Sequence, residues 1–249
     1  MDNRMFGKRA RHSRVAHELG KRIVGGVYEP GALLPPDTSV GEEMDVSRTA
    51  LREAFKVLTA KGLIESRQKV GTRVMARKDW NMLDPDVLSW SFAAKPSAQF
   101  LESLFEMRRV VEPAAAAMTA ERRTDEQLAE IEAAYYSMEQ APPDMEEMLT
   151  TDLRFHLSIL NGTGNEFMVT LGMMIETALI SSFNLSSSVP SAFSDALDSH
   201  KAVYLGIRNR DARRARFEME ALLDKSIKDA LSALEQGRDI VPNLQLAAD

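Results

Sequence analysis

Apolar residues near the start of the chain recur with helical spacing. Val15, Leu19 and Ile23 are four residues apart, and Gly25 follows with a second glycine, which predicts an amphipathic helix that ends there. A turn rich in proline and glycine comes next. A second, short helix is therefore expected over about residues 37–44.

A third helix and a hairpin are expected directly afterwards. The turn Asp45-Val46-Ser47 precedes four apolar residues at helical spacing, namely Leu51, Ala54, Phe55 and Leu58. Residues 63–67 and 72–75 then read as short strands around a basic tip that contains glycine. Three helices followed by such a hairpin predict a winged helix-turn-helix.

The rest of the chain shows helical patterns and no comparable strand signal. Residues 79–96, with two Trp and two Pro, fit neither helix nor strand and are interpreted as an interdomain connection that docks through its aromatic residues. Helices are expected over 97–122, 124–140, 143–161, 165–187, 191–209 and 211–236. The predicted fold class is mainly α, with a winged helix-turn-helix domain at 1–78, the connection at 79–96, an all-helical bundle sensor domain at 97–240 and a tail at 241–249.

Composition excludes several classes of protein. Hydrophobic residues make up 44% and charged residues 27% of the 249 positions, which is typical of a globular chain. No apolar run reaches the ~18 residues of a membrane span, and no apolar segment follows the basic first residues as it would in a secretory signal. A cytoplasmic protein without membrane association is expected. Without cysteine, only His and carboxylates remain as metal ligands.

The net charge of −6 conceals two halves of opposite sign. Residues 1–78 contain 16 Lys/Arg and 9 Asp/Glu, a balance of +7, whereas the remainder contains 15 and 28, a balance of −13. Only the first part is therefore expected to meet a polyanion.

The start of the third helix carries the residue types that read DNA. Ser47, Arg48 and Thr49 stand at its first turn, and Arg52 lies one turn after Arg48 on the same face. A guanidinium there can contact guanine O6 and N7. A solvated helix face is the alternative reading, but the neighbouring turn, hairpin and positive charge favour DNA.

The same region resembles the DNA-binding domain of the GntR family of bacterial repressors. The resemblance rests on Pro30-Gly31-x-x-Leu34-Pro35, Val46-Ser47-Arg48-Thr49-x-Leu51-Arg52-Glu53-Ala54, Gly62-Leu63-Ile64 and Gly71-Thr72. It implies a homodimer on double-stranded operator DNA. It also implies base contacts by Arg48 and Arg52, phosphate or base contacts by Ser47 and Thr49, and a wing with Lys69 and Gly71 near the minor groove. Pro36 and Thr38 depart from the family, which often has Ser and Arg or Glu there.

Three residues of the helical half form a candidate metal site. Asp152 and His156 are four residues apart on one expected helix, and His200 lies on another. Asp with two His suits a divalent metal such as zinc with open coordination positions. The alternative is that each histidine is an ordinary core or surface residue.

This half resembles the FCD sensor domain of the FadR subfamily. That pattern has Asp-x-x-x-His and a later His, and often a last His 22 positions further on, where this chain has Leu222. The resemblance implies a metal held by Asp152, His156 and His200, with Glu176 and Glu218 as possible substitutes for the missing ligand. It favours Arg108 over Arg109 as the guanidinium that binds a carboxylate effector. Similarity to repressors of galactonate and related sugar-acid operons implies that this effector is a sugar acid.

Two other readings stay open at this stage. The same regulator could bind a fatty acyl-CoA or another organic acid without metal, in which case the Asp and His residues would be idle. A metal-dependent enzyme is the other reading. The sequence has no HExxH motif, no nucleophile elbow and no phosphate loop. An enzyme would also leave the basic domain unexplained, so no enzyme is expected.

Overall fold

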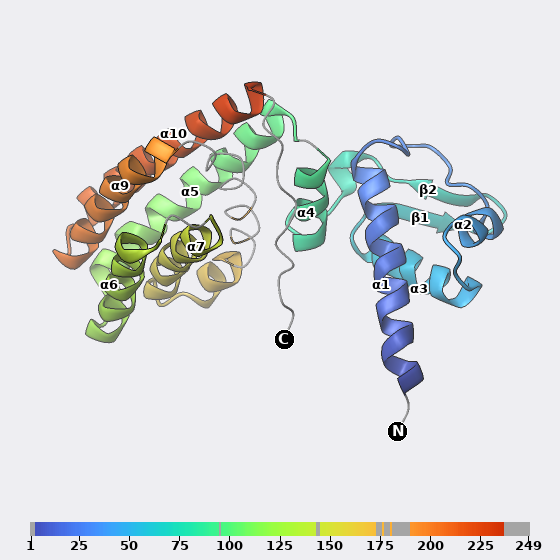
Figure 1. Ribbon diagram of the computed structural model, residues 1–249, viewed down its shortest axis with the longest axis horizontal. Helices are drawn as coiled ribbons and strands as arrows, with labels where there is room; N and C mark the ends of the chain where they lie inside the picture. Colours follow the sequence, from blue (N-terminus) through green and yellow to red (C-terminus); the bar gives the residue numbers. More distant parts are fainter. Residues whose placement is uncertain are drawn as a thin grey trace. The chain divides into compact units, whose positions relative to one another are not determined.

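The computed structural model describes residues 3–94, 96–142, 145–172, 176, 180 and 190–236 (Figure 1). The chain divides into two compact units, Met1–Pro96 and Ser97–Asp249. The expected mainly α architecture is confirmed, since the described residues form helices and one two-stranded sheet. The expected tail at 241–249 lies outside the described residues.

The first unit contains a three-helix core and a hairpin. Its elements are α1 (Asn3–Val24), α2 (Asp37–Glu43), α3 (Arg48–Ala60), β1 (Ile64–Arg67), β2 (Gly71–Val74), the 3-10 helix η1 (Arg77–Asp79) and α4 (Pro85–Ala93). Helices α1 and α3 pack together because each has an apolar stripe, and Leu19, Ile23 and Leu58 are fully buried between them. The expected winged helix-turn-helix is therefore present.

The hairpin forms a narrow wing. Strands β1 and β2 are antiparallel, with Ile64 opposite Val74 and Arg67 opposite Gly71. Leu33 adds an isolated bridge to Arg73 and extends the base of the wing. Its tip needs left-handed backbone, which Gly71 adopts at φ +107° without strain.

Residues 79–96 contain regular structure that the sequence analysis did not expect. Helix α4 begins after Asp84, whose side chain accepts hydrogen bonds from the amides of Asp86 and Val87. It packs on α1, where Trp90 covers Gly20 and donates a 2.9 Å hydrogen bond from Nε1 to Nδ1 of His17. The expectation that this segment is neither helix nor strand is wrong for Pro85–Ala93.

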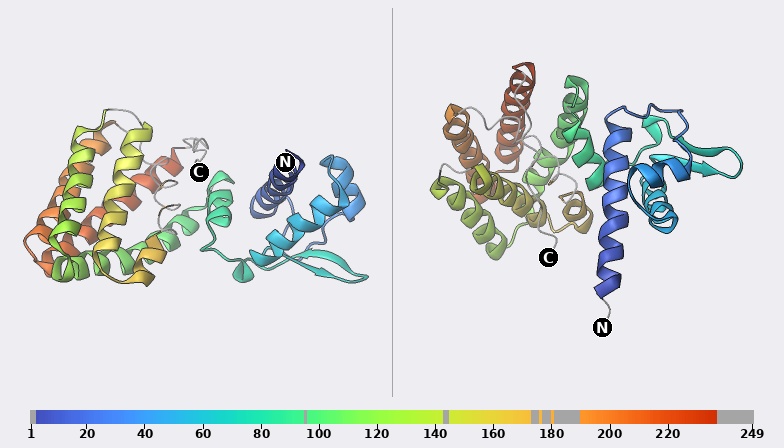
Figure 2. Two further views of the ribbon diagram at one scale, coloured as in Figure 1. Left: turned by 90° about the horizontal axis from the view of Figure 1, so that it is seen from below. Right: turned by 45° about the vertical axis from the view of Figure 1, so that its right-hand side comes forward.

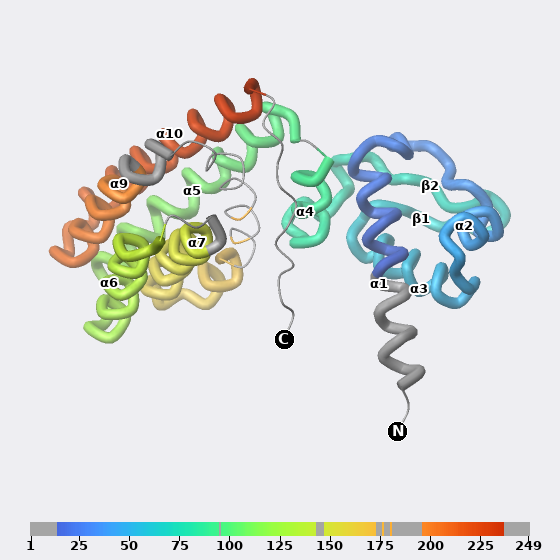
Figure 3. The backbone as a smooth tube through the Cα atoms, in the orientation of Figure 1, coloured from blue at the N-terminus to red at the C-terminus, as the bar shows by residue number. Residues whose placement is uncertain are grey.

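The second unit is a helical bundle. Its helices are α5 (Ala98–Arg122), α6 (Asp125–Gln140), α7 (Met145–Gly162), α9 (Pro190–Arg208) and α10 (Ala212–Glu235). Helix α5 packs against α7, α9 and α10, and α6 packs against α7 and α9, as the views in Figure 2 and the trace in Figure 3 show. Residues 166–172 are also helical, and most of the helix expected over 165–187 lies outside the described residues.

The bundle core contains both small and large apolar side chains. Ala115 and Ala116 let α5 approach its neighbours closely, while Phe155, Ile159 and Ile207 fill the remaining space. In the described part of the chain, no helix has both the length and the apolar character needed to cross a membrane.

Candidate functional site

The N-terminal turn of α3 presents polar side chains to solvent. Ser47 caps the helix, because its Oγ accepts a 3.2 Å hydrogen bond from the amide of Ala50. Arg48, Thr49 and Arg52 are exposed on the face opposite the buried stripe. Among the described residues, neither guanidinium has an ion-pair partner. Both side chains can therefore extend toward a ligand without breaking an ion pair.

The wing tip is exposed as well. Lys69 adopts a left-handed backbone at φ +64°, next to Gly71 in the same turn. Ser66 and Thr72 share a 2.9 Å hydrogen bond across the strands just below the tip. The tip is thus held at the end of a short, braced hairpin.

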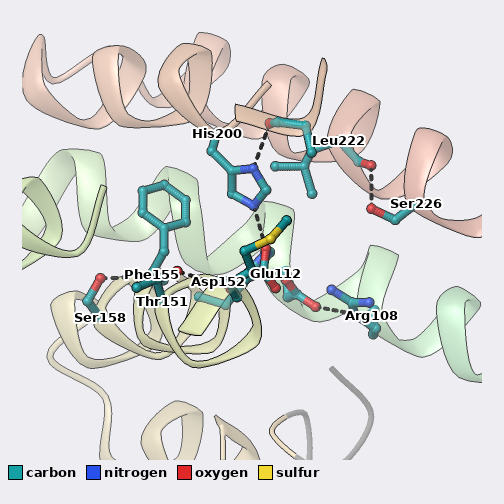
Figure 4. A network of polar contacts seen from close by, with 12 residues as sticks. Arg108, Glu112, Thr151, Asp152, Phe155, Ser158, His200, Leu222 and Ser226 are labelled. Carbon is teal, nitrogen blue, oxygen red and sulfur yellow. Dashed lines mark hydrogen bonds and ion pairs between the residues drawn. The ribbon is translucent and has the colours of Figure 1, made fainter. Parts of the chain in front are cut away.

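A second cluster lies inside the bundle of the second unit. Asp152 and His156 lie on α7 and His200 on α9, and one ligand atom from each falls within 4.8 Å of the others. Both histidines are at most 3% exposed, and the Asp152 side chain is 13% exposed. The structure brings together the three residues that the sequence singled out, and Figure 4 shows how Asp152 and His200 face each other.

The hydrogen bonds of His200 define which ring nitrogen is free. Its Nδ1 lies 2.7 Å from the carbonyl oxygen of Ala196, and a carbonyl only accepts, so Nδ1 carries the proton. In the neutral ring, Nε2 then carries a lone pair and no proton. It lies buried 3.0 Å from Oδ1 of Asp152 without hydrogen-bond alignment. Asp152 thus faces this nitrogen at ion-pair distance, and either a proton on Nε2 or a bound cation would stabilise the contact.

His156 is oriented by a carboxylate. Its Nδ1 lies 2.6 Å from Oε2 of Glu112, so Nδ1 is the donor and Nε2 remains free as a ligand. The other oxygen of Glu112 accepts a 2.6 Å hydrogen bond from Nε of Arg108. Arg108 and Glu112 are each 2% exposed and form a buried ion pair one helical turn apart.

Charges within the cluster hold its carboxylates ionised. Burial raises the pKa of Glu112, but Arg108 and His156 outweigh it and bring the pKa to about 2. Burial likewise opposes ionisation of Asp152, yet its neighbours, chiefly His200, keep its pKa below the ordinary value. Both groups are therefore anionic at neutral pH.

The other residues considered for the effector and metal sites do not supply ligand atoms to this cluster. Arg109 points to the surface, where its Nη2 pairs with Asp224 at 2.5 Å. Glu218 pairs with Arg214 along α10 at 3.5 Å, and neither Glu218 nor Glu176 belongs to the cluster of ligand atoms among the described residues. The buried side chain of Leu222 stands beside the ring of His200 (Figure 4).

The donor set fits a divalent transition metal. Two imidazole nitrogens and one carboxylate are ordinary zinc ligands, and three protein ligands leave a position for water or an effector. Each histidine also has the second hydrogen bond that orients metal-binding imidazoles, one to a carboxylate and one to a carbonyl.

Sequence reasoning missed the role of Glu112. Its spacing from Arg108 is that of a common surface pair on a helix, and nothing in the local pattern shows that both side chains are buried. The available signal was an ion pair inside a helix that is otherwise rich in apolar residues.

Two family models match the chain. The model described as "Bacterial regulatory proteins, gntR family" matches residues 11–74, which include the three-helix core and the wing. The model of the FCD domain matches residues 103–225, which include the whole Asp152, His156 and His200 cluster.

The chain is similar to known transcription regulators, one of them over nearly its whole length. The galactonate operon transcriptional repressor of Escherichia coli (strain K12) is 34% identical over 220 residues, covering 87% of this chain and 96% of that protein. The Uxu operon transcriptional regulator of the same organism is 30% identical over 154 residues, covering 60% and 57%. A solved structure of Lar from Listeria monocytogenes shares the fold, with a TM-score of 0.64 and 19% identity over 89% of this chain and 96% of that one.

Proposed function

The chain belongs to the GntR family of bacterial regulatory proteins, and we propose that it controls a sugar-acid operon through a metal-assisted effector site. Its relatives are transcription regulators, so it is a regulator and not an enzyme. The observation that carries the proposal is the convergence of Asp152, His156 and His200 next to the buried Arg108.

The first unit is the part that binds operator DNA in this proposal. Arg48 and Arg52 read base edges in the major groove, Ser47 and Thr49 contact phosphates or bases, and the wing reaches the adjacent minor groove with Lys69 and Gly71. One recognition helix covers only a few base pairs, so a homodimer on a two-fold symmetric site is expected. The protein would act as a repressor in the cytoplasm, where bacterial DNA lies.

The second unit binds the effector. Asp152, His156 and His200 would hold a divalent ion such as Zn²⁺, which when bound supplies a Lewis acid for the carboxylate and a hydroxyl of the effector. Arg108 offers a guanidinium to the same carboxylate. Because residues 79–249 carry a charge of −13, an anionic effector needs these positive groups to be buried favourably.

The chemistry of this cluster favours a small polar acid over an acyl-CoA. An acyl chain requires a long apolar tunnel, whereas the described centre of the bundle has buried Arg, Glu and His side chains. A sugar acid is supported further by similarity to the galactonate operon repressor. If the effector is instead an organic acid bound without metal, a chelator will leave its affinity unchanged.

The first experiment is a thermal-shift screen of aldonates and uronates with and without a chelator, followed by calorimetry on the best acid. His156→Ala and Arg108→Ala should each weaken effector binding, and chelation should weaken it in the parent. Arg109→Ala, a surface arginine next to Arg108, is the matched control and should bind as the parent does. Unchanged affinity in the chelated parent and in both site variants would reject the proposed site.

A further inference from the structure

Glu112 lies between the two parts of the proposed effector site. It follows Arg108 by one turn of α5 and faces His156 of α7. Oε1 accepts from Nε of Arg108 at 2.6 Å, and Oε2 accepts from Nδ1 of His156 at 2.6 Å. All three side chains are at most 2% exposed, so water does not compete for either contact.

We propose that Glu112 is a positioning residue that couples effector binding to metal binding, an inference that rests on the function proposed above. By accepting the Nδ1 proton it selects the tautomer of His156 whose Nε2 can bind metal. By holding Nε of Arg108 it leaves the two Nη groups, which have no hydrogen-bond partner among the described residues, free for a carboxylate. A single carboxylate thus fixes the group that binds the effector and a ligand that binds the metal.

A purely structural ion pair would not need this arrangement. Arg108 alone balances the charge of Glu112, so the contact with His156 adds nothing to charge neutrality. His200 shows the alternative, because its Nδ1 is oriented by the carbonyl of Ala196, which is not connected to Arg108. The link between the two functions therefore runs through His156 and Glu112.

The test measures Zn²⁺ affinity and galactonate affinity in the parent, Glu112→Gln and Glu112→Asp. Gln accepts at only one position and presents an amide donor to the other neighbour, while Asp keeps the charge but is too short to reach both. Each variant should bind Zn²⁺ about 10- to 100-fold more weakly. The absorption spectrum of the Co²⁺-substituted protein should change as well, which reports ligand geometry independently of DNA binding.

The decisive quantity is the ratio of galactonate Kd without Zn²⁺ to that with Zn²⁺. This ratio should fall toward one in both Glu112 variants. Thr119→Val is the matched control, because it removes a buried 2.6 Å hydrogen bond between the same two helices, from Thr119 Oγ1 to the carbonyl of Ile159. It should lower Tm and leave Zn²⁺ affinity and the ratio unchanged.

The outcomes separate this inference from the function on which it rests. If the parent binds Zn²⁺ and galactonate with coupling and both Glu112 variants keep the same ratio, the inference is wrong and the proposed function stands. An equal loss in Thr119→Val would also overturn it, because general loosening would then explain the effect. A parent that binds neither Zn²⁺ nor galactonate would overturn both.

Discussion

Nε2 of His200 lies 3.0 Å from Oδ1 of Asp152, with the Nδ1 proton of the ring already donated to a carbonyl. Two acceptor atoms at this distance repel each other unless a cation or a proton lies between them. The pair therefore needs a shared positive charge, which either a proton on Nε2 or an ion bound by both side chains would supply.

Leu222→His should add a fourth ligand to this cluster. Leu222 is 3% exposed and its side chain stands beside the ring of His200, so an imidazole at this position can face an ion held by the cluster as proposed (Figure 4). We expect tighter Zn²⁺ binding and a smaller dependence on effector, measured by competition with a fluorescent chelator. Leu222→Phe, which introduces a ring without a ligating nitrogen, is the control. Equal Zn²⁺ affinity in the two variants would argue against a metal at this position.

Arg48→Ala and Arg52→Ala should each lose about 1–3 kcal/mol of discrimination between operator variants. Both side chains are exposed, so the fold should remain intact. Lys69→Ala should instead weaken binding evenly across sequences and reduce the salt slope by about one. Fluorescence anisotropy over a panel of operator variants measures these effects, with Arg122→Ala, an exposed arginine of α5, as control. An arginine variant that ranks the panel as the parent does would show that this arginine reads no bases.

Gly20→Ala should loosen the contact between α4 and α1. A Cβ at Gly20 would lie 2.2 Å from Cζ3 of Trp90, so the indole must move and the variant should lose about 1–3 kcal/mol of stability. Red-shifted tryptophan emission would report the exposure of Trp90. Gly41→Ala, whose methyl group meets no atom nearer than 3.3 Å, is a milder control. Unchanged emission and stability in Gly20→Ala would contradict the packing described.

Two tyrosines of the bundle should ionise late. Burial, reinforced by Glu139 for Tyr135 and by Glu132 for Tyr204, raises the pKa of each phenol from 10.0 to about 12. The folded state holds these protons more tightly than the unfolded state, so their contribution to stability is complete below pH 10 and is lost as pH rises toward 12. Absorbance of tyrosinate against pH measures this directly. The late phase should shrink in Tyr204→Phe, and an unaltered titration curve would refute the assignment.

Helical periodicity was sufficient to predict most of the fold. Helices α1, α3 and α7 are amphipathic, and the residues of the turn before α3 and of the wing tip are typical of turns. Helix α4 was missed because Val87, Leu88 and Trp90 are all buried together with Ser91 and Phe92, so no polar stripe marks a helical period. A helix that is buried on several sides lacks the periodic pattern of apolar and polar residues from which helices are predicted.

Part of the candidate site could be predicted from local sequence spacing, and the rest depends on tertiary packing. The spacing of Asp152 and His156 is local, so the sequence places them on one face of a helix. His200 joins them only through the packing of α9 in the bundle, which spacing alone does not specify. The burial of Glu112 is likewise a tertiary fact, because an i, i+4 pair with Arg108 looks the same at the surface and in the core.

Release of operator DNA by a sugar acid can be measured by fluorescence anisotropy with and without a chelator. We expect galactonate or a related acid to release the DNA from the Zn²⁺-loaded parent, and we expect chelation or His156→Ala to abolish this response while DNA binding itself persists. Equal release from the loaded, chelated and His156→Ala proteins would contradict this expectation.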